Sequence, residues 1–121
     1  MPPEPNVHQH RWQAQHNEDL LNQTPLPPDW EVTIRFYAVA HWVRAYLKKA
    51  LRVASIPSHP ETDRLLREAK IQEDIIQLFK TLRAKSEYAR YYCIHPKPEE
   101  LDSLRKAHQR LRSFFEPKTR E

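Results

Sequence analysis

The chain has 121 residues, of which 39% are apolar and 30% are charged, and its formal net charge is +4. This length corresponds to one domain, and no apolar run approaches the roughly 20 residues that a membrane span needs. The absence of glycine excludes the glycine-rich loops of P-loop and Rossmann nucleotide sites, and it disfavours tight β-hairpins.

The first predicted helix covers about residues 7–22. Asn6 is a good N-cap for it. The helical spacing of Trp12, His16 and Leu20 predicts the stripe that docks on the rest of the protein. The prolines that follow residue 23 end this helix, because proline cannot continue one.

The second predicted helix runs from about Asp29 to Ala54, with Asp29 as its N-cap and Pro57 beyond its end. Its helical periodicity predicts a long apolar stripe. The residues of that stripe are Ile34, Tyr37, Ala38, His41, Ala45 and residues 47 to 51.

A third helical stretch opens at Ser58, where serine followed three residues later by Glu61 is a capping-box pattern. It continues to Tyr92, which is long for one helix, so a break is expected near residues 70–73. The predicted stripe consists of Leu65, Leu66, Ala69, Ile71, Ile75, Leu78 or Phe79, Leu82, Tyr88 or Ala89, and Tyr92.

The last predicted helix covers about residues 98–115, with a proline in its first turn and acidic residues near its start. Its stripe is Leu101, Leu104, His108, Leu111 and Phe115. Short connections between long helices predict an all-α, antiparallel up-and-down bundle of four to five helices. We expect one domain over residues 7–116, with a disordered tail at 1–6 and a polar tail at 117–121.

The single cysteine, Cys93, rules out an intrachain disulfide. Because it lies among Tyr91, Tyr92 and Ile94, we expect a packed thiol. The low cysteine content, and an N-terminus without a basic-then-apolar signal, predict a cytoplasmic protein.

The seven histidines do not form a zinc-type spacing, so no metal site and no cofactor are predicted. His41 is different, because it interrupts the apolar stripe of the second helix. Two interpretations stay open for it, a core histidine hydrogen-bonded to a neighbour or a catalytic residue.

Ser58, His59 and Arg64 come together at the start of the third helical stretch. They are either a cap with a solvated arginine, or an anion site in which backbone N–H groups and the arginine bind phosphate.

The segment from Ser86 to His95 carries Arg90, three tyrosines and a terminal histidine. His95 can act as a general base on a ribose 2′-OH, and Arg90 can stabilise charge on the phosphorus. Tyrosines such as Tyr91 can stack on bases. The alternative is a helix C-terminus with core aromatics and a histidine favoured by the helix dipole.

Three segments resemble the small prokaryotic HEPN-like proteins. They are Pro28-Asp29-Trp30 followed by Tyr37-Ala38, His41 and Tyr46-Leu47; Ser58-His59-Pro60-Glu61-Thr62-Asp63-Arg64; and Ser86 followed by Ala89-Arg90-Tyr91. The resemblance implies a helical bundle that is usually dimeric. It also implies a metal-independent ribonuclease motif, which Arg90 and His95 match in spacing, and an antitoxin-type protein partner. Tyr91 departs from the motif, since active members carry Asn, Asp or His after the arginine.

The leading prediction is therefore a HEPN-like protein that binds or cleaves RNA, or binds nucleotides. The catalytic pair would be Arg90 and His95. The supporting polar residues would be Tyr37, His41, Ser58, His59, Arg64, Ser86 and Tyr91. The alternative is a non-catalytic helical module that binds a partner protein.

Overall fold

A computed structural model describes residues 2–56 and 58–120 of the chain. These residues form five α-helices and one 3-10 turn, and none of them is in a strand. The elements are α1 (Val7–Gln23), α2 (Pro28–Leu51), α3 (His59–Glu68), α4 (Glu73–Tyr91), α5 (Pro98–Phe115) and η1 (Glu116–Thr119). The all-α bundle prediction is confirmed. The expected stop at Pro57 and the outermost residues of both tails, Met1 and Glu121, lie outside the described residues.

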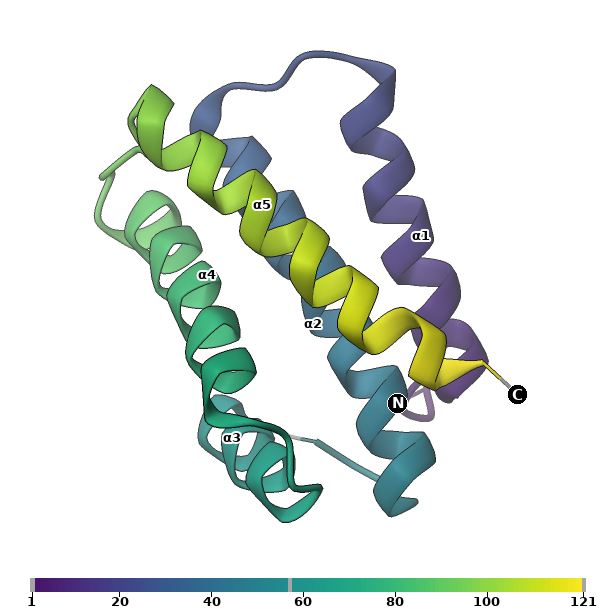
Figure 1. Ribbon diagram of the computed structural model, residues 1–121. Coiled ribbons are helices and arrows are strands. Elements are labelled where there is room, and N and C mark those ends of the chain that lie inside the picture. The colour runs from purple at the N-terminus through teal and green to yellow at the C-terminus, as the bar shows by residue number, and fades with distance from the viewer. Residues whose placement is uncertain (1, 57, 121) are drawn as a thin grey trace.

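The four long helices alternate in direction, and α2 contacts each of the other helices (Figure 1). Glu31 near the start of α2 pairs with Arg105 in the first half of α5, and Tyr46 packs on Phe115 near the ends of both helices. These two helices therefore run in the same direction, whereas α1 and α4 run opposite to them. The short α3 lies below the start of α4 (Figure 1).

Two predicted helix boundaries of α2 are wrong. Its N-cap position is Pro27, and Asp29 lies inside the first turn without capping it. The helix ends at Leu51 because Arg52 takes a left-handed conformation with φ 53°, which an α-helix cannot continue.

The third helical stretch divides where it was expected to. Ser58 caps α3 by accepting a hydrogen bond from the backbone N–H of Glu61. Lys70 then adopts φ 62°, and the Ile71 N–H donates to the Leu66 carbonyl at 3.1 Å. This six-to-one bond is the Schellman ending of a helix, so the predicted break near residues 70–73 is confirmed.

The core is formed where the apolar stripes of α2, α4 and α5 meet. The predicted stripe of α5 is confirmed, since all five of its residues are buried. The predicted stripe of α1 is wrong: Trp12 is 60% exposed and Leu20 38% exposed. The buried residues of α1 are His10, Ala14 and Glu18, so this helix docks through a largely polar face.

The end of α4 also differs from the prediction. Of the two predicted alternatives, Ala89 is buried and Tyr88 is exposed, but Tyr92, which was expected in the stripe, is exposed as well. Cys93 follows in a left-handed conformation and is exposed, so the packed thiol that we expected is not found.

Both ends of the chain are held against the bundle. Glu4 accepts a hydrogen bond from the Ile56 N–H at 3.1 Å and pairs with Lys48. Residues 117–119 were expected in a polar tail, but they belong to η1, in which Thr119 is buried and bonded to Arg11.

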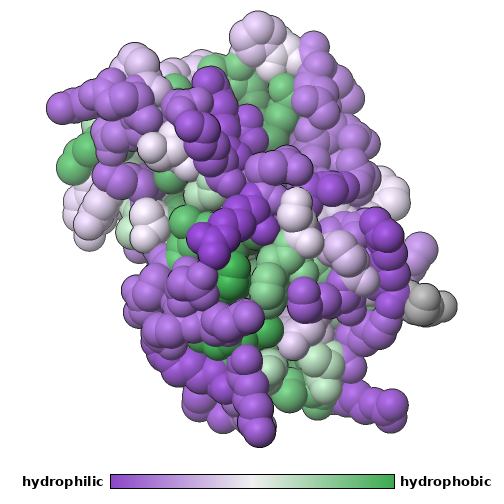
Figure 2. Space-filling model, viewed as in Figure 1, coloured by the Kyte–Doolittle hydropathy of each residue, from purple (hydrophilic) through white to green (hydrophobic). Residues whose placement is uncertain are grey.

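The surface is mainly hydrophilic in the view of Figure 2, and hydrophobic residues show only in patches between charged ones. Among the described residues, no helix combines the length and apolar character needed to cross a membrane.

Candidate functional site

One side of α2 stays open to solvent, whereas the side that faces the core is buried. Trp30, Tyr37 and Arg44 follow one another at seven-residue steps, and His41 lies one turn from the last two. At 3.6 residues per turn these positions share one side of the helix. Trp30 is 57% and Tyr37 40% exposed, while His41 and Arg44 are half-buried. We call this side the open face of α2.

Arg90 of α4 reaches across to the open face of α2. Its Nη1 donates to the hydroxyl oxygens of Tyr37 at 2.8 Å and Tyr91 at 3.1 Å. Its Nη2 donates to Ser86 Oγ at 2.9 Å. The guanidinium also lies 5.2 Å from the Tyr37 ring centre and 4.9 Å from that of Tyr91. All of these partners are neutral, so the positive charge of Arg90 is not balanced by a carboxylate.

Arg44 is the second cation of the open face. No hydrogen bond or ion pair involves its side chain in residues 2–56 and 58–120. Its positive charge helps to lower the pKa of His41 and His59. Arg44 also helps to lower the pKa of His10, so its charge lies close to histidines of α1, α2 and α3.

The three residues of the predicted anion site at the start of α3 do not face one common site in the structure. His59 packs edge-on against Phe36 with ring centres 6.0 Å apart. Burial lowers the pKa of His59, and the nearby Arg83 and Arg44 lower it further. Arg64 instead points to solvent and pairs with Glu61 and Glu68. Ser58 serves as the cap of α3, so only His59 approaches the open face of α2.

His41 is bonded to a neighbouring histidine, as one of its two predicted interpretations required. Its Nδ1 lies 2.9 Å from Nδ1 of His10, which is buried. Burial, with a smaller contribution from the positive charge of Arg44, lowers the pKa of both rings to about 4. At neutral pH both rings are therefore neutral, and one of them donates a hydrogen bond to the other.

His95 lies apart from Arg90. Its side chain is 53% exposed, and its Nε2 lies 3.9 Å from the Asp29 carboxylate. No hydrogen bond or ion pair joins it to Arg90 within the described part of the chain. Asp29 and Arg90 both line a cavity of about 180 Å³ beside Trp30, so His95 borders this cavity through Asp29.

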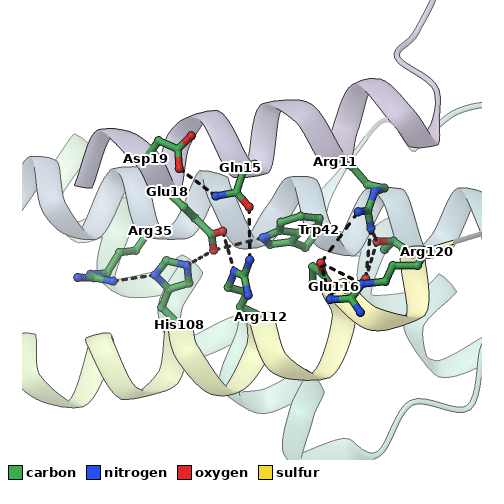
Figure 3. A network of polar contacts seen from close by, with 11 residues as sticks. Arg11, Gln15, Glu18, Asp19, Arg35, Trp42, His108, Arg112, Glu116 and Arg120 are labelled. Carbon is green, nitrogen blue, oxygen red and sulfur yellow. Dashed lines mark hydrogen bonds and ion pairs between the residues drawn. The ribbon is translucent and has the colours of Figure 1, made fainter. Parts of the chain in front are cut away.

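A second polar cluster, which the sequence reasoning missed, is buried between α1, α2 and α5 (Figure 3). Glu18 accepts from His108 Nε2 at 2.7 Å, from Arg112 Nε at 2.8 Å and from Trp42 Nε1 at 3.2 Å. Burial raises the pKa of Glu18, but the hydrogen bonds from His108 and Arg112 outweigh it and hold the pKa below its ordinary value. Glu18 is therefore an ionised carboxylate inside the bundle.

The hydrogen bonds of this cluster also determine which ring nitrogen of His108 carries the proton. Arg35 Nη1 lies 2.7 Å from His108 Nδ1. A guanidinium can only donate, so Nδ1 must accept and the proton sits on Nε2. His108 then donates to Glu18 as a neutral ring. The cluster, here called the Glu18 network, links three helices through alternating donors and acceptors.

The sequence around Arg44 indicates that this arginine has no local acidic partner, whereas nothing in the sequence indicates that Glu18 is buried. Positions 40, 41, 47 and 48, which neighbour Arg44 on α2, carry no acidic residue, so no partner one turn away can pair with it. The stripe of His10, Ala14 and Glu18 contains one apolar residue, and a polar stripe is indistinguishable from a solvated face before the packing is known.

No group of three or more His, Cys, Asp or Glu residues in the described ranges is arranged to hold a metal ion. No protein-family model matches the chain, and no curated protein or solved structure is significantly similar to it. The HEPN resemblance thus stays a prediction.

Proposed function

We propose that the protein binds single-stranded RNA, or a nucleotide derived from it, along the open face of α2. The observation that carries the proposal is that two guanidinium groups without a carboxylate partner, Arg44 on α2 and Arg90 beside it, occur together with the exposed rings of Trp30, Tyr37 and Tyr91. Cations along a groove attract the phosphate backbone, and aromatic faces stack on bases without requiring a particular sequence. The net charge of +4 favours an anionic partner as well.

The arrangement of Arg90 favours binding of a strand over a purely structural role. Its neutral partners orient the guanidinium without cancelling its charge. A phosphate oxygen can then accept a charge-assisted hydrogen bond from a donor that is already in position. Tyr91, which is 69% exposed, offers a ring beside that donor.

The test is fluorescence anisotropy of a labelled single-stranded RNA oligomer, measured at several salt concentrations. We expect Arg44→Gln and Arg90→Gln each to weaken binding roughly tenfold and to reduce the slope of log affinity against log salt by about 0.7, the loss of one phosphate contact. Tyr91→Ala should also weaken binding roughly tenfold, since stacking contributes about 1–3 kcal/mol per base.

Arg110→Gln is the matched control. This arginine is exposed on α5, where it pairs with Asp74, and its loss changes the net charge by the same amount. If it weakens binding as much as Arg44→Gln does, the interaction is non-specific and the proposal is wrong. Absence of binding at low salt has the same consequence.

Strand cleavage is the finer form of the proposal, and it derives from the HEPN resemblance. It requires a base at His95 and a stabilising cation at Arg90 acting on one phosphate. A ribonuclease assay with chelator should then show activity that both His95→Ala and Arg90→Ala abolish. If the wild type binds RNA but does not cut it, binding is the whole function.

A protein partner is the second candidate for the same surface. Tyr88, Tyr92 and Ile94 are further large apolar side chains that are exposed near Tyr91, and tyrosine, tryptophan and arginine are enriched among the residues that contribute most to binding at protein interfaces. The partner can be a second copy of the chain or an antitoxin-type protein. Sedimentation that shows a homodimer, with Tyr91→Ala dissociating it and RNA binding absent, would favour this candidate.

A further inference from the structure

A cavity of about 260 Å³ lies between α1, α2 and α5, beside the Glu18 network. Its lining is polar apart from Leu21, and it includes Arg35, Arg112 and the side-chain amides of Asn22 and Gln109. Small-molecule sites are usually lined by apolar groups with a few polar ones. A cavity that is lined mainly by polar groups is better suited to a small, strongly polar ligand.

The Glu18 network orients both arginines but leaves part of each guanidinium unused. Arg35 donates from Nε to Glu31 at 2.9 Å and from Nη1 to His108 at 2.7 Å. Arg112 donates from Nε to Glu18 at 2.8 Å, and from Nη2 to Gln15 at 3.3 Å.

Within residues 2–56 and 58–120, Nη2 of Arg35 and Nη1 of Arg112 have no acceptor. The cavity therefore has N–H donors held in fixed directions.

The charges around the cavity do not cancel. Arg112 is balanced by Glu18, and His108 is neutral because its Nδ1 accepts from Arg35. At the other end, Glu31 is shared between Arg35 and Arg105, which leaves one positive charge in excess. All three acceptor bonds of Glu18 are directed to His108, Arg112 and Trp42, so its carboxylate is already satisfied.

We infer that this cavity is a binding site for a small oxyanion, a carboxylate or a phosphate group on a small molecule. The negative charge of the oxyanion would lie at the Arg35 end of the cavity, where positive charge is in excess. Nη1 of Arg112 and the amides of Asn22 and Gln109 supply further donors. Arginine suits this task because its planar fork matches the oxygens of carboxylate and phosphate. The site is independent of the open face of α2, which lies elsewhere on the same helix.

The test is an NMR titration of the full chain with sodium phosphate and, separately, with sodium acetate, at constant ionic strength against sodium chloride. We expect saturable shifts of the side-chain N–H signals of Arg35, Arg112 and Gln109 with at least one of the two anions. The anion that saturates at the lower concentration identifies the head group. Shifts that do not saturate, or that chloride reproduces, would overturn the inference.

Arg35→Gln should weaken the binding at least tenfold. Arg105→Gln removes the excess charge beside the same Glu31 but no donor that lines the cavity, so it should weaken binding clearly less than Arg35→Gln does. Equal weakening in both variants would show a diffuse charge effect and would contradict the site.

If Arg35→Gln does not fold, Gln109→Leu replaces an exposed lining residue and should weaken binding at least threefold. Unchanged affinity in that variant would also refute the site. Arg90→Gln should bind the anion as the wild type does, so failure of the RNA proposal and failure of this one are distinguishable.

Discussion

The His10–His41 pair shows how burial changes the chemistry of single residues. Two imidazoles 2.9 Å apart exchange one hydrogen bond, and Arg44 and Lys48 place positive charge near them while Glu4 places negative charge. His10 is buried and His41 is half-buried. Burial disfavours the charged form of each ring, so the pKa of each falls to about 4. Lowering the pH therefore lowers the free energy of unfolding, because the unfolded histidines take up protons more readily than this pair does.

The predicted effect is a loss of stability between pH 6.5 and pH 4. In this range the unfolded histidines, with a pKa near 6.5, bind protons that the folded ones do not. The free energy of unfolding then falls as the pH falls, by up to about 1.4 kcal/mol per pH unit for each histidine. Urea denaturation at a series of pH values measures this slope.

His41→Gln should have a shallower slope over the same range, because one of the two depressed groups is gone. His16→Gln is the control, since this ring is exposed and stacks on Trp12. Identical slopes for the wild type and His41→Gln would show that the pair does not govern the acid response.

Helix endings show the consequence of a chain without glycine at the scale of the element. Arg52, Lys70 and Cys93 all adopt a positive φ at or after the end of a helix. Side chains with a Cβ pay about 1–2 kcal/mol for this conformation, whereas glycine does not. Among the described residues, the backbone is therefore strained at these three positions, each of which lies in a short connection after a helix.

Lys70→Gly should therefore raise the free energy of unfolding by about 0.5–1 kcal/mol, since glycine relieves the left-handed strain but gains entropy when unfolded. Thermal denaturation would show a higher midpoint. Lys80→Gly is the matched control, because the same change in the interior of α4 should destabilise by about 1 kcal/mol. A lower midpoint for Lys70→Gly would mean that the Lys70 side chain stabilises the turn in another way.

At the scale of the whole molecule, the Glu18 network performs the task that apolar packing performs elsewhere. α1 buries a polar stripe, and long side chains from α5 reach it across the space between the two helices (Figure 3). Arg112 also lies 5.7 Å from the Trp42 ring centre. Glu18 thus accepts two of the hydrogen bonds that join α5 to α1, and Gln15 accepts a third from Arg112.

Glu18→Ala should lower the free energy of unfolding by about 3–5 kcal/mol, the usual effect of removing one partner from a buried ion pair. The loss leaves Arg112, His108 and Trp42 with buried donors that no longer have an acceptor. Chemical denaturation followed by tryptophan fluorescence measures the change. Asp19→Ala, at an exposed neighbour bonded to Gln15, should change the stability by less than about 0.5 kcal/mol. A similarly small effect of both substitutions would show that the Glu18 network does not stabilise the folded protein.

Elements were predictable where local chemistry decides them. Five helices, the cap at Ser58, the break after Lys70 and the whole stripe of α5 follow from prolines, capping patterns and apolar spacing. The site was less predictable. Tyr37, Ser86, Arg90 and Tyr91 were named as candidates and do meet, whereas Arg64 and His95 point to other partners.

The amino-acid sequence by itself determined the helical class, a count of four to five helices and where most of them begin and end, because these depend on backbone dihedral preferences and neighbours within one turn. Only the tertiary structure decided that α1 turns Glu18 inward and Trp12 outward, and that Arg90 of α4 reaches Tyr37 of α2. Burial of a charge is favourable only when donors from other helices surround it. Those donors, His108 and Arg112, lie about 90 residues away in the chain.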